Sequence, residues 1–582
     1  MKKHVILMLL FSIMLVHSEK GFRFAVIGDR AGGHIDNIFE EIIDEVRIID
    51  PEFVICVGDL IEGYTDDTLA MHAEWDTIFN VVQRLSCPFY FVAGNHDISN
   101  EADRYIYEQR TGVKRYYSFD YKNNHFVILD NTMTYWSSPQ PVDGKQLDWL
   151  REDLEKSRGA DNTFVFYHIP RYLDAYITGE PDPLAEVCRG YGVDIIFTGH
   201  WHSYVYLNDV RDNMEFITIG SSGGSMDTGD FARGHFYHYL MVNVKEDDRS
   251  VAVVRKGNVF PANIVTASDH QEIQRADAEV VQMDPCFVKD QGKKICKDVS
   301  MLINNFGPDS IIDTLIWNYD PTRYEIKPDR IILEVGSEDR KEYNFRMTLK
   351  DNSDIFPLPQ SSFLYPFTYG KACTLRNFLS IKRVKEVKKT KTAPVIDGKL
   401  DDKVWQKTKP ITHLGTYNGQ ADPPVENTEV YISYDDENLY MGVRCFESDF
   451  SQVLAQENER DGRSPWDDNL WFFFDTNSDN QTYYQAIINS NGAIFDRECS
   501  MINGESTRNI MWDGPWEIVP GKESDAWILE IKIPKQGLAP YSKGQWGFNF
   551  RRLQPRPGMG DAGYWSIPFG HDPNSFGLLE FK

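Results

Sequence analysis

Five apolar runs, each followed directly or after one glycine by a polar residue, restrict the fold of this chain more than any other feature. They lie at residues 24–27, 53–57, 89–93, 164–167 and 195–198, and each is typical of a buried strand. Between them, apolar residues recur at helical spacing over residues 35–49, 69–85 and 146–156. Strands that alternate with helices predict an α/β layered domain with its helices outside. Strands at 238–244 and 251–255 follow without helices and suit a pair of layered sheets.

Side chains that bind metals follow these strands. The segments are Gly28-Asp29, Gly58-Asp59, Gly94-Asn95-His96-Asp97, His168 and Gly199-His200-Trp201-His202. In an α/β sheet the carboxyl ends of neighbouring strands converge on one crevice, so we expect these residues to meet. A glycine before the ligand lets a strand turn sharply, because no Cβ obstructs the turn. Carboxylates, an amide and imidazoles together predict a two-metal hydrolytic site.

The ordered set resembles the calcineurin-like metallophosphoesterase superfamily over about residues 22–260. The resemblance implies that six residues hold two divalent cations, Mn, Fe or Zn: Asp29, Asp59, Asn95, His168, His200 and His202. Asp59 would bridge the two cations, with Asp29 and His202 completing one site and Asn95, His168 and His200 the other. His96 would protonate the leaving oxygen of a phosphate ester, and Asp97 would orient His96.

Elementary chemistry supports these implied roles. Both oxygens of a carboxylate carry lone pairs, so an aspartate can bridge two cations, whereas an imidazole binds one. Two cations about 4 Å apart polarise a phosphoryl oxygen and activate water near neutral pH. A carboxylate behind an imidazole fixes its tautomer and orientation.

Two positions depart from the family pattern. Many members carry His two residues after the first Asp, where this chain has Ala31, so the Asp29 site is expected to bind its cation more weakly. His34 is close in sequence but is not expected to replace that ligand. Purple acid phosphatases carry Tyr three residues after the second Asp, where this chain has Glu62, and Tyr64 falls two residues later. A tyrosinate–iron charge-transfer band is therefore not expected.

A single histidine at a strand end is more often an ordinary polar residue than a ligand. The ordered set raises the metal interpretation for His168 well above that background. His125, His235 and His238 belong to no ligand pattern and are interpreted as ordinary residues.

Length and charge limit the remaining possibilities. The chain has 582 residues, which predicts two to four domains. It carries 61 basic and 88 acidic residues, a formal net charge of −27. Such a field disfavours nucleic acid as the main partner, because no basic stripe offsets it.

The first eighteen residues are typical of a secretory signal. Lys2 and Lys3 precede an apolar stretch over residues 5–16, and small residues follow at the expected cleavage point. The stretch is shorter than the ~20 residues of a membrane-spanning helix. We therefore expect an exported protein without a transmembrane segment. Export permits a disulfide between Cys286 and Cys296, which the sequence leaves open.

A second kind of domain begins after about residue 262. Short alternating strands at 299–303, 311–316, 330–335 and 343–349 predict a β-sandwich over residues 280–385. It is similar to the immunoglobulin-like spacer domains of extracellular enzymes. A packing module is the preferred interpretation of this domain.

A polar linker at residues 388–394 precedes a third domain. Its motifs include IDGKLDDKVW at 396–405, WDDNLWFFFD at 466–475 and WGFNFRR at 546–552. Over residues 390–582 these resemble the family 9 carbohydrate-binding module, which implies a β-sandwich that folds alone. Trp466 and Trp565 could stack on a sugar with Arg551 nearby, or each Trp could pack in the core. Sugar-binding members tend to carry Glu where this chain has Trp471.

These features favour an exported, metal-dependent phosphoesterase that hydrolyses a phosphate mono- or diester. The C-terminal module would attach the enzyme to glycan or to a surface. Two alternatives remain open. The first is a binding or adhesion protein whose enzyme domain has lost activity, which the absence of a histidine at Ala31 favours. The second is an active enzyme whose C-terminal sandwich is only structural.

Overall fold

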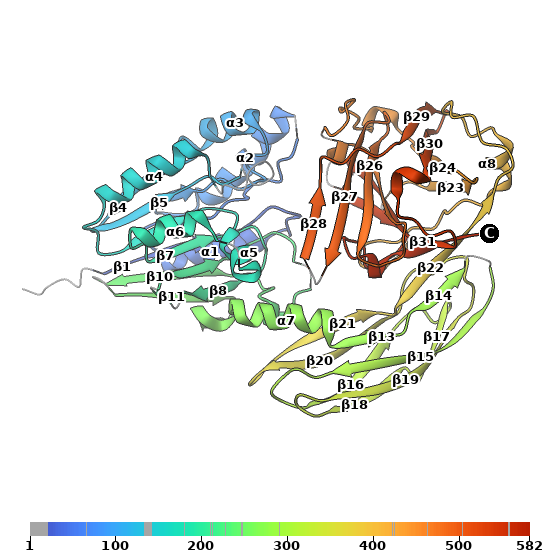
Figure 1. Cartoon of the computed structure of the whole chain (residues 1–582). Coiled ribbons are helices and arrows are strands. Elements are labelled where there is room, and N and C mark those ends of the chain that lie inside the picture. The colour runs from blue at the N-terminus through green and yellow to red at the C-terminus, as the bar shows by residue number, and fades with distance from the viewer. Residues whose placement is uncertain are drawn as a thin grey trace, which may run out of the picture. The chain divides into compact units, whose positions relative to one another are not determined.

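The computed structural model of the chain is shown in Figure 1. It describes residues 21–582 except 66, 133–141, 180, 210, 212, 227, 246–247, 290–291, 422, 424, 463, 503–504 and 557–558. The expected leader, residues 1–18, lies outside the described residues. The chain forms two compact units. The first contains the residues up to 275 together with 370–373, and the second contains residues 276–369 together with 374–582. Each is described by itself.

The first unit contains two six-stranded sheets. The first sheet has the order β12 (Asn258–Pro261), β11 (Asp248–Arg255), β10 (Tyr239–Lys245), β1 (Phe22–Ile27), β2 (Val54–Cys56) and β3 (Phe89–Phe91). The second has the order β4 (Tyr117–Tyr121), β5 (Asn124–Ile128), β6 (Thr163–Phe166), β7 (Ile195–Thr198), β9 (Glu215–Thr218) and β8 (Val205–Asn208). Strands β1, β2 and β3 are parallel, as are β5, β6, β7 and β9. The strands predicted from the five apolar runs are therefore confirmed, but they divide between two sheets.

A phenylalanine-rich core lies between the two sheets. The ring centroids of Phe24 on β1 and Phe164 on β6 are 5.5 Å apart, and both side chains are fully buried. Every second residue of a strand points to the same face, so the intervening residues point outward to the helices. On the outer face of the first sheet, Ala25 and Ile27 pack with buried residues of the first helices, such as Phe39 and Trp75. The carboxyl ends of strands from both sheets thus meet at one edge of the sandwich.

The helices of this unit cover the outer faces of the sheets (Figure 1). They are α1 (Ile38–Ile49), α2 (Thr68–Val82), α3 (Glu101–Thr111), α4 (Gly144–Lys156), α5 (Arg171–Thr178), α6 (Pro183–Gly190) and α7 (Ala267–Glu279). Asp67 caps α2 by accepting hydrogen bonds from the N–H groups of Leu69 and Ala70, which satisfies donors that the helix leaves open. The helices predicted at residues 35–49, 69–85 and 146–156 match α1, α2 and α4 to within a few residues at each end.

The middle region forms two four-stranded sheets, as predicted for a β-sandwich. One has the order β13 (Val281–Met283), β15 (Ile295–Asn304), β19 (Arg340–Leu349) and β17 (Tyr324–Lys327). The other has the order β18 (Arg330–Val335), β16 (Ile311–Asn318), β20 (Gln360–Thr368) and β21 (Lys371–Phe378). The rings of Trp317 on β16 and Phe345 on β19 lie 5.0 Å apart, so the two sheets contact each other through apolar side chains.

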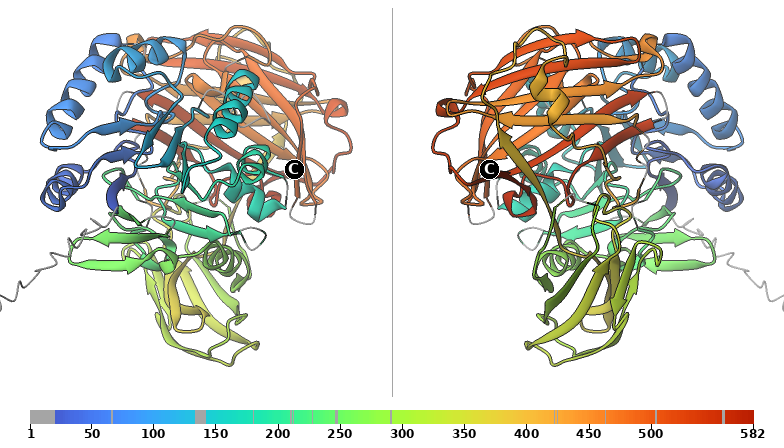
Figure 2. Two further views of the ribbon diagram at one scale, coloured as in Figure 1. Left: turned by 90° about the vertical axis from the view of Figure 1, so that its left-hand side faces the viewer. Right: turned by 90° about the vertical axis from the view of Figure 1, so that its right-hand side faces the viewer.

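The C-terminal region is one long sheet that folds back on itself as a sandwich; Figure 2 shows its long strands side by side. Its order is β28 (Glu505–Asn509), β27 (Ile494–Ile502), β26 (Thr482–Asn489), β25 (Asn469–Asp475), β31 (Gln545–Arg556), β33 (Gly577–Phe581), β22 (Ile381–Lys389), β23 (Thr428–Tyr434), β24 (Asn438–Phe446), β30 (Ala526–Pro534) and β29 (Glu517–Lys522). Strand β32 (Met559–Tyr564) pairs with β31, and β14 (Cys286–Lys289) pairs with β22. Phe472 and Phe548 of one half share a core with Val443 and Leu529 of the other.

Strand β22 corrects the expected start of this domain at residue 390. It lies between β33 and β23, with Val384 opposite Leu578 and Val387 opposite Phe581. The Val387 side chain is fully buried in the core. The predicted linker began at Lys388, but Lys388 and Lys389 are the last residues of β22. The domain therefore includes a central strand that precedes the predicted boundary.

We expect a fragment of residues 379–582 to unfold cooperatively and a fragment of residues 390–582 to lack a cooperative transition. The shorter fragment loses a strand from the middle of the sheet, which leaves the backbone groups of both β33 and β23 without partners. Thermal unfolding followed by circular dichroism would test this. Equal midpoints for the two fragments would show that β22 is not needed.

All eight cysteines are free, so the pairing of Cys286 with Cys296 that the sequence left open is not formed. Cys56 is fully buried on β2, as expected, and burial raises the pKa of its thiol. In the described part of the chain, no helix combines the length and apolar character needed to span a bilayer.

Candidate metal centre

Two buried aspartates form the floor of the candidate site. Asp29 directly follows Gly28 at the end of β1 and is fully buried, and Asp59 follows Gly58 after β2 and is 1% exposed. Asp59 has a φ of 55°, in the left-handed region that side chains other than glycine rarely adopt. His200 and His202 also have positive φ, 74° and 50°. Backbone strain of this kind persists only where the surrounding structure enforces it, and it concentrates at functional sites.

Two glycines allow the ligand loops to approach one another. A Cβ on Gly94 would lie 2.1 Å from Asp59 Oδ1, and a Cβ on Gly199 would lie 2.3 Å from Asp29 Oδ1. Both distances are far shorter than any real contact of a Cβ atom. The glycines predicted to permit sharp turns thus also make room for the two carboxylates.

The candidate ligands come together as the sequence predicts. His168 Nε2 lies 3.0 Å from Asp59 Oδ2, and a ligand atom of His200 lies within 4.8 Å of both. His202 Nε2 lies 3.4 Å from Asp29 Oδ2. The His200 N–H donates a 2.7 Å hydrogen bond to Asp29 Oδ2, which joins the two strand ends.

Hydrogen bonds fix two of the imidazoles so that Nε2 faces the carboxylates. His168 Nδ1 lies 2.9 Å from the carbonyl oxygen of Val57, and His202 Nδ1 lies 2.5 Å from that of Ser225. A carbonyl oxygen only accepts, so each Nδ1 carries the proton and donates it. When the ring is neutral, the lone pair is then on Nε2, as a metal ligand requires.

Two buried acceptor atoms of the candidate set, Asp29 Oδ1 and Asn95 Oδ1, have no hydrogen-bond partner among the described residues, and the buried His168 Nε2 faces the Asp59 carboxylate. A buried polar atom without a partner is costly, and it calls for an explanation such as an ion. Carboxylate, amide and imidazole atoms are all suitable ligands for divalent cations of the Mn, Fe and Zn type. The residues present therefore fit two such cations.

Electrostatic coupling within the group favours positive charge at its centre. Burial opposes ionisation of Asp59, but the charges and hydrogen bonds of His168 and His96 outweigh it and lower the pKa of Asp59. Burial also opposes protonation of His168, yet the carboxylates of Asp59 and Asp29 raise its pKa to about 9. For His200, burial and the neighbouring His168 lower the pKa to about 4. The two buried carboxylates thus stabilise cationic partners, the electrostatic condition of a cation site.

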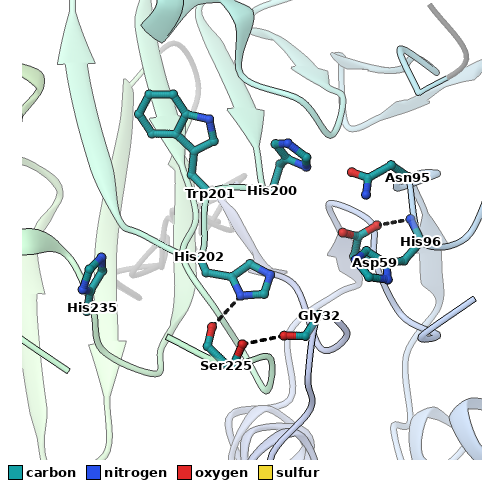
Figure 3. Close-up of a pocket in the computed structure, with 9 residues that line it drawn as sticks. All are labelled: Gly32, Asp59, Asn95, His96, His200, Trp201, His202, Ser225 and His235. Atoms are coloured by element: carbon teal, nitrogen blue, oxygen red, sulfur yellow. Dashed lines mark hydrogen bonds between the residues drawn. The ribbon is translucent and has the colours of Figure 1, made fainter. Parts of the chain in front are cut away.

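The pocket over this group is drawn in Figure 3. Its lining includes Asp59, Asn95, His96, His200 and His202, and these side chains converge from both sheets. Asp29 and His168 are fully buried and do not line the pocket. Trp201 and His235 also line the pocket. The sequence pattern did not predict that His235 would lie there.

His235 stands apart from the candidate ligands in this view, and its Nδ1 lies 2.7 Å from Thr228 Oγ1. The other two histidines interpreted as ordinary are buried elsewhere. His125 contacts the carboxylates of Asp120 and Asp153, and His238 Nδ1 contacts the carbonyl oxygen of Phe236.

The ring of His96 is oriented by a backbone carbonyl group and not by the expected carboxylate. Its Nδ1 lies 2.7 Å from the carbonyl oxygen of Glu62, so that carbonyl, and not the Asp97 carboxylate, orients the ring. Asp97 accepts hydrogen bonds from four backbone N–H groups, those of Asp59, Leu60, Ile61 and Gly94. A carboxylate occupied by four backbone donors fastens the two ligand loops together. Asp97 therefore shapes the loops, and the expectation that it orients His96 was wrong.

Glu62 also belongs to the site. In the sequence it stood out only because it occupies the position of Tyr in purple acid phosphatases. Its carboxylate accepts hydrogen bonds from the N–H groups of Gly32, Gly33 and His34, at 2.9–3.2 Å. It also contacts His34 Nδ1 at 3.1 Å, so His34 turns to Glu62. Through its carboxylate and its carbonyl, Glu62 ties the loop after Asp29 to His96. Its position three residues after Asp59 was the only signal in the sequence.

Tyr64 also belongs to the surroundings of the site. Asn95 Nδ2 donates a 2.9 Å hydrogen bond to its hydroxyl, which turns Asn95 Oδ1 away from Tyr64. The Tyr64 ring meets the His96 ring edge to face, with centroids 4.8 Å apart. Tyr64 was predicted only not to act as a tyrosinate ligand, and its placement beside Asn95 was not foreseen.

The candidate sugar-stacking residues of the C-terminal domain do not form a pair of exposed aromatic faces. Trp565 is 2% exposed and packs on Phe548 and Phe550 in the core, so it has no face for a sugar. The Trp466 side chain lies outside the described residues. Arg551 is half-buried and stacks over Trp471, with 3.7 Å from its Cζ to the ring centroid.

Comparison with known proteins agrees with this arrangement. Residues 22–204 match the family model for calcineurin-like phosphoesterases, and residues 396–564 match that for carbohydrate family 9 binding domain-like proteins. Purple acid phosphatase 23 of Arabidopsis thaliana is 26% identical over 34% of this chain and 52% of its own length. A probable cyclic nucleotide phosphodiesterase of Psychrobacter arcticus is 23% identical over 28% of this chain and 62% of its own. The chain thus spans about half to three-fifths of the length of these relatives.

Among solved structures, a dimetal phosphatase from Danio rerio is 16% identical, with a TM-score of 0.32, over 41% of this chain and 98% of its own. The two family matches fall on the two parts of the chain where the motifs lie. The chain therefore joins an N-terminal domain of the calcineurin-like phosphoesterase family to a C-terminal domain of the carbohydrate family 9 binding-like type.

Proposed function

We propose that this protein is an exported phosphoesterase that hydrolyses a phosphate mono- or diester at a two-metal site. The observation that carries the proposal is the pair of buried, unpartnered acceptor atoms Asp29 Oδ1 and Asn95 Oδ1, together with the contact of His168 Nε2 with the Asp59 carboxylate, at one pocket. Two other observations support it: the match of residues 22–204 to calcineurin-like phosphoesterases and the relatives named as phosphatases.

The residues of the chain divide between binding and proton transfer. Asp29 and His202 would hold one cation, Asn95, His168 and His200 the other, and Asp59 both. When bound, the two cations supply a Lewis acid for the phosphoryl oxygens and lower the pKa of a water molecule. His96 Nδ1 donates to the Glu62 carbonyl oxygen, so Nε2 is the atom that delivers a proton to the leaving oxygen. Figure 3 shows His96 beside Asp59 on the pocket wall.

The relatives include enzymes named for monoester and for diester substrates, so both ester classes remain candidates for this protein. One relative is named a purple acid phosphatase and another a probable cyclic nucleotide phosphodiesterase. The position of Tyr in purple acid phosphatases is occupied here by Glu62, whose carboxylate is fully engaged with the 32–34 loop. A tyrosinate–iron absorption band is therefore not expected of this protein.

The C-terminal domain would attach the enzyme to carbohydrate. Its match to the carbohydrate family 9 binding domain-like model supports this role, as does the export that the first eighteen residues predict. Since Trp565 is in the core, attachment through a pair of facing tryptophans that includes Trp565 is not proposed. A purely structural domain is the alternative, and saccharide binding by the full chain decides between the two.

We expect two divalent cations per chain, with the Asp29 site the weaker, because the buried Ala31 supplies no imidazole. Elemental analysis and calorimetric titration with Mn²⁺, Fe²⁺ or Zn²⁺ would measure the stoichiometry. A screen of aryl phosphate mono- and diesters with each cation would then identify the ester class, and a chelator should abolish turnover. Absence of bound metal together with absence of activation by all three cations would favour the degraded binding protein.

A further inference from the structure

Three arginines project from one face of the C-terminal sheet. Arg497 on β27 pairs in register with Gln485 on β26, and Arg551 on β31 pairs with Trp471 on β25. Arg508 on β28 pairs with Cys499 on β27. Residues paired across neighbouring strands point to the same side, and alternate residues of one strand share a side. The three guanidinium groups therefore occupy the face opposite to the Phe472 core; β26, β27, β28 and β31 are labelled in Figure 1.

These arginines lack carboxylate partners, unlike Arg556, Arg444 and Arg460 of the same domain. Arg556 pairs with Glu447 at 2.5 Å and Asp468 at 2.9 Å, Arg444 with Glu429 at 2.7 Å, and Arg460 with Asp496 at 3.2 Å. Among the described side chains, no carboxylate oxygen lies within 4.0 Å of the guanidinium nitrogens of Arg497, Arg508 or Arg551. In a chain with a formal net charge of −27, such a group is an unusual concentration of uncompensated positive charge.

Buried donors without partners surround the same arginines. Gln485 is fully buried; its Oε1 accepts a hydrogen bond from Arg497 Nε, and its Nε2 has no partner among the described residues. The Arg551 Nε and the Trp471 Nε1, both buried, are also without a partner there. One orphaned acceptor, Asp475 Oδ1, lies four residues along β25 from Trp471, whereas the orphaned atoms beside the arginines are all donors. A ligand that satisfies them must present acceptor atoms.

His571 shows how the local charge is distributed. Its Nδ1 lies 2.6 Å from the Tyr483 hydroxyl, and its Nε2 lies 3.4 Å from Arg497 Nη2. Burial, followed by the charges of Arg508, Arg497 and Arg551, lowers its pKa to about 3. His571 is thus neutral at physiological pH, and the positive charge of this face comes from the three arginines. Asp475 is on the same face at the far end of β25; its Oδ2 accepts from the Asn480 N–H, and its Oδ1 has no partner among the described residues.

We propose that this face binds an oxoanion, a sulfate ester or a carboxylate, carried by an acidic saccharide. The arginines supply charge-assisted donors that match the planar or tetrahedral oxygens of such a group. The half-buried ring of Phe569, 5.7 Å from the Arg551 Cζ, provides an apolar surface beside them for a sugar ring. The saccharide part of the proposal rests on the proposed carbohydrate role of this domain.

The test is calorimetric titration of the full-length protein with three disaccharides of one size: sulfated, uronate-containing and neutral. We expect at least one acidic disaccharide to bind at least about tenfold more tightly than the neutral one. Its affinity should fall as the salt concentration is raised from about 0.05 to about 0.5 M. The sulfated and uronate arms separate the two sources of the anion. Equal binding of acidic and neutral disaccharides would overturn the anion site and leave the carbohydrate role intact, whereas binding of none of them, together with no response to inorganic sulfate, would overturn both.

Variants locate the site on the protein. Arg508 is on an exposed edge strand. The substitutions Arg508→Gln and Arg497→Gln should each lower the affinity for the acidic disaccharide about tenfold. Lys532→Gln removes the same charge from the other half of the sheet, where Lys532 pairs with Glu517, and should leave binding unchanged. Inorganic sulfate serves as a fourth titrant: a response to sulfate with none to any saccharide would overturn the saccharide part. Unaltered affinity of the acidic disaccharide in both arginine variants would overturn the assignment to this face.

Discussion

Gly94→Ala is expected to abolish turnover and remove metal from the enzyme while the domain stays folded. The added methyl group would lie 2.1 Å from Asp59 Oδ1 and 2.2 Å from Asp59 N, so the proposed bridging carboxylate must move. Loss of an outer partner of a metal ligand commonly costs 10–100-fold in affinity or activity, and displacement of the ligand itself should cost about 10²-fold or more. Metal content and kcat/KM, measured together, test this.

Gly144→Ala is the matched control for this change. Gly144 opens α4 at the surface, its φ is not positive, and a Cβ there would meet no heavy atom within 4 Å. The same methyl group should therefore leave metal and turnover unchanged and stabilise the helix slightly. Retention of both metals and full activity in the Gly94 variant would show that Asp59 does not occupy the proposed bridging position.

The sequence allowed the strand ends and their polar residues to be predicted because their signals are local. An apolar run ends, a glycine follows, and a ligand type comes next, as at Gly58-Asp59 and Gly199-His200. The partners of these residues were harder to predict. His96 and Asp97 are adjacent, which suggested a contact, yet the Asp97 carboxylate reaches backbone donors of the 59–61 loop and a distant carbonyl orients His96. Such contacts depend on how two loops pack, for which a single sequence carries no periodic signal.

The C-terminal domain shows the same limit in its pattern of burial. The aromatic residues at 546–552 predicted a sandwich correctly, but alternation alone does not say which of two faces becomes the core. Trp565 follows β32 and packs on Phe548 and Phe550, while Trp471 takes the outer face beside Arg551. Strand β22 was missed for a related reason: charged residues dominate its composition, although two of them, Arg383 and Lys385, are buried beside Val384 and Val387.

His96→Ala is expected to retain both cations but to lower kcat by about 10²–10⁴ for an ester with a poor leaving group, the usual contribution of a positioned general acid. His96 is outside the proposed ligand set, and its ring is held by the Glu62 carbonyl at 2.7 Å, so its removal leaves the ligands in place. An alkoxide must gain a proton as it departs, whereas nitrophenolate departs with little help. The defect should therefore shrink steeply as the pKa of the leaving group falls.

The measurement is a plot of log kcat against leaving-group pKa for a series of aryl and alkyl phosphate esters, with metal content determined on the same samples. The variant should show a steeper negative slope than the unmodified enzyme, because it lacks the proton that offsets charge on the leaving oxygen. His72→Ala, on α2 and away from the pocket, is the control for loss of an imidazole. Parallel slopes with metal retained would mean that His96 binds the phosphoryl group without transferring a proton. Loss of metal would instead mean that the His96 side chain is needed to hold a cation, as a ligand or as a support of one.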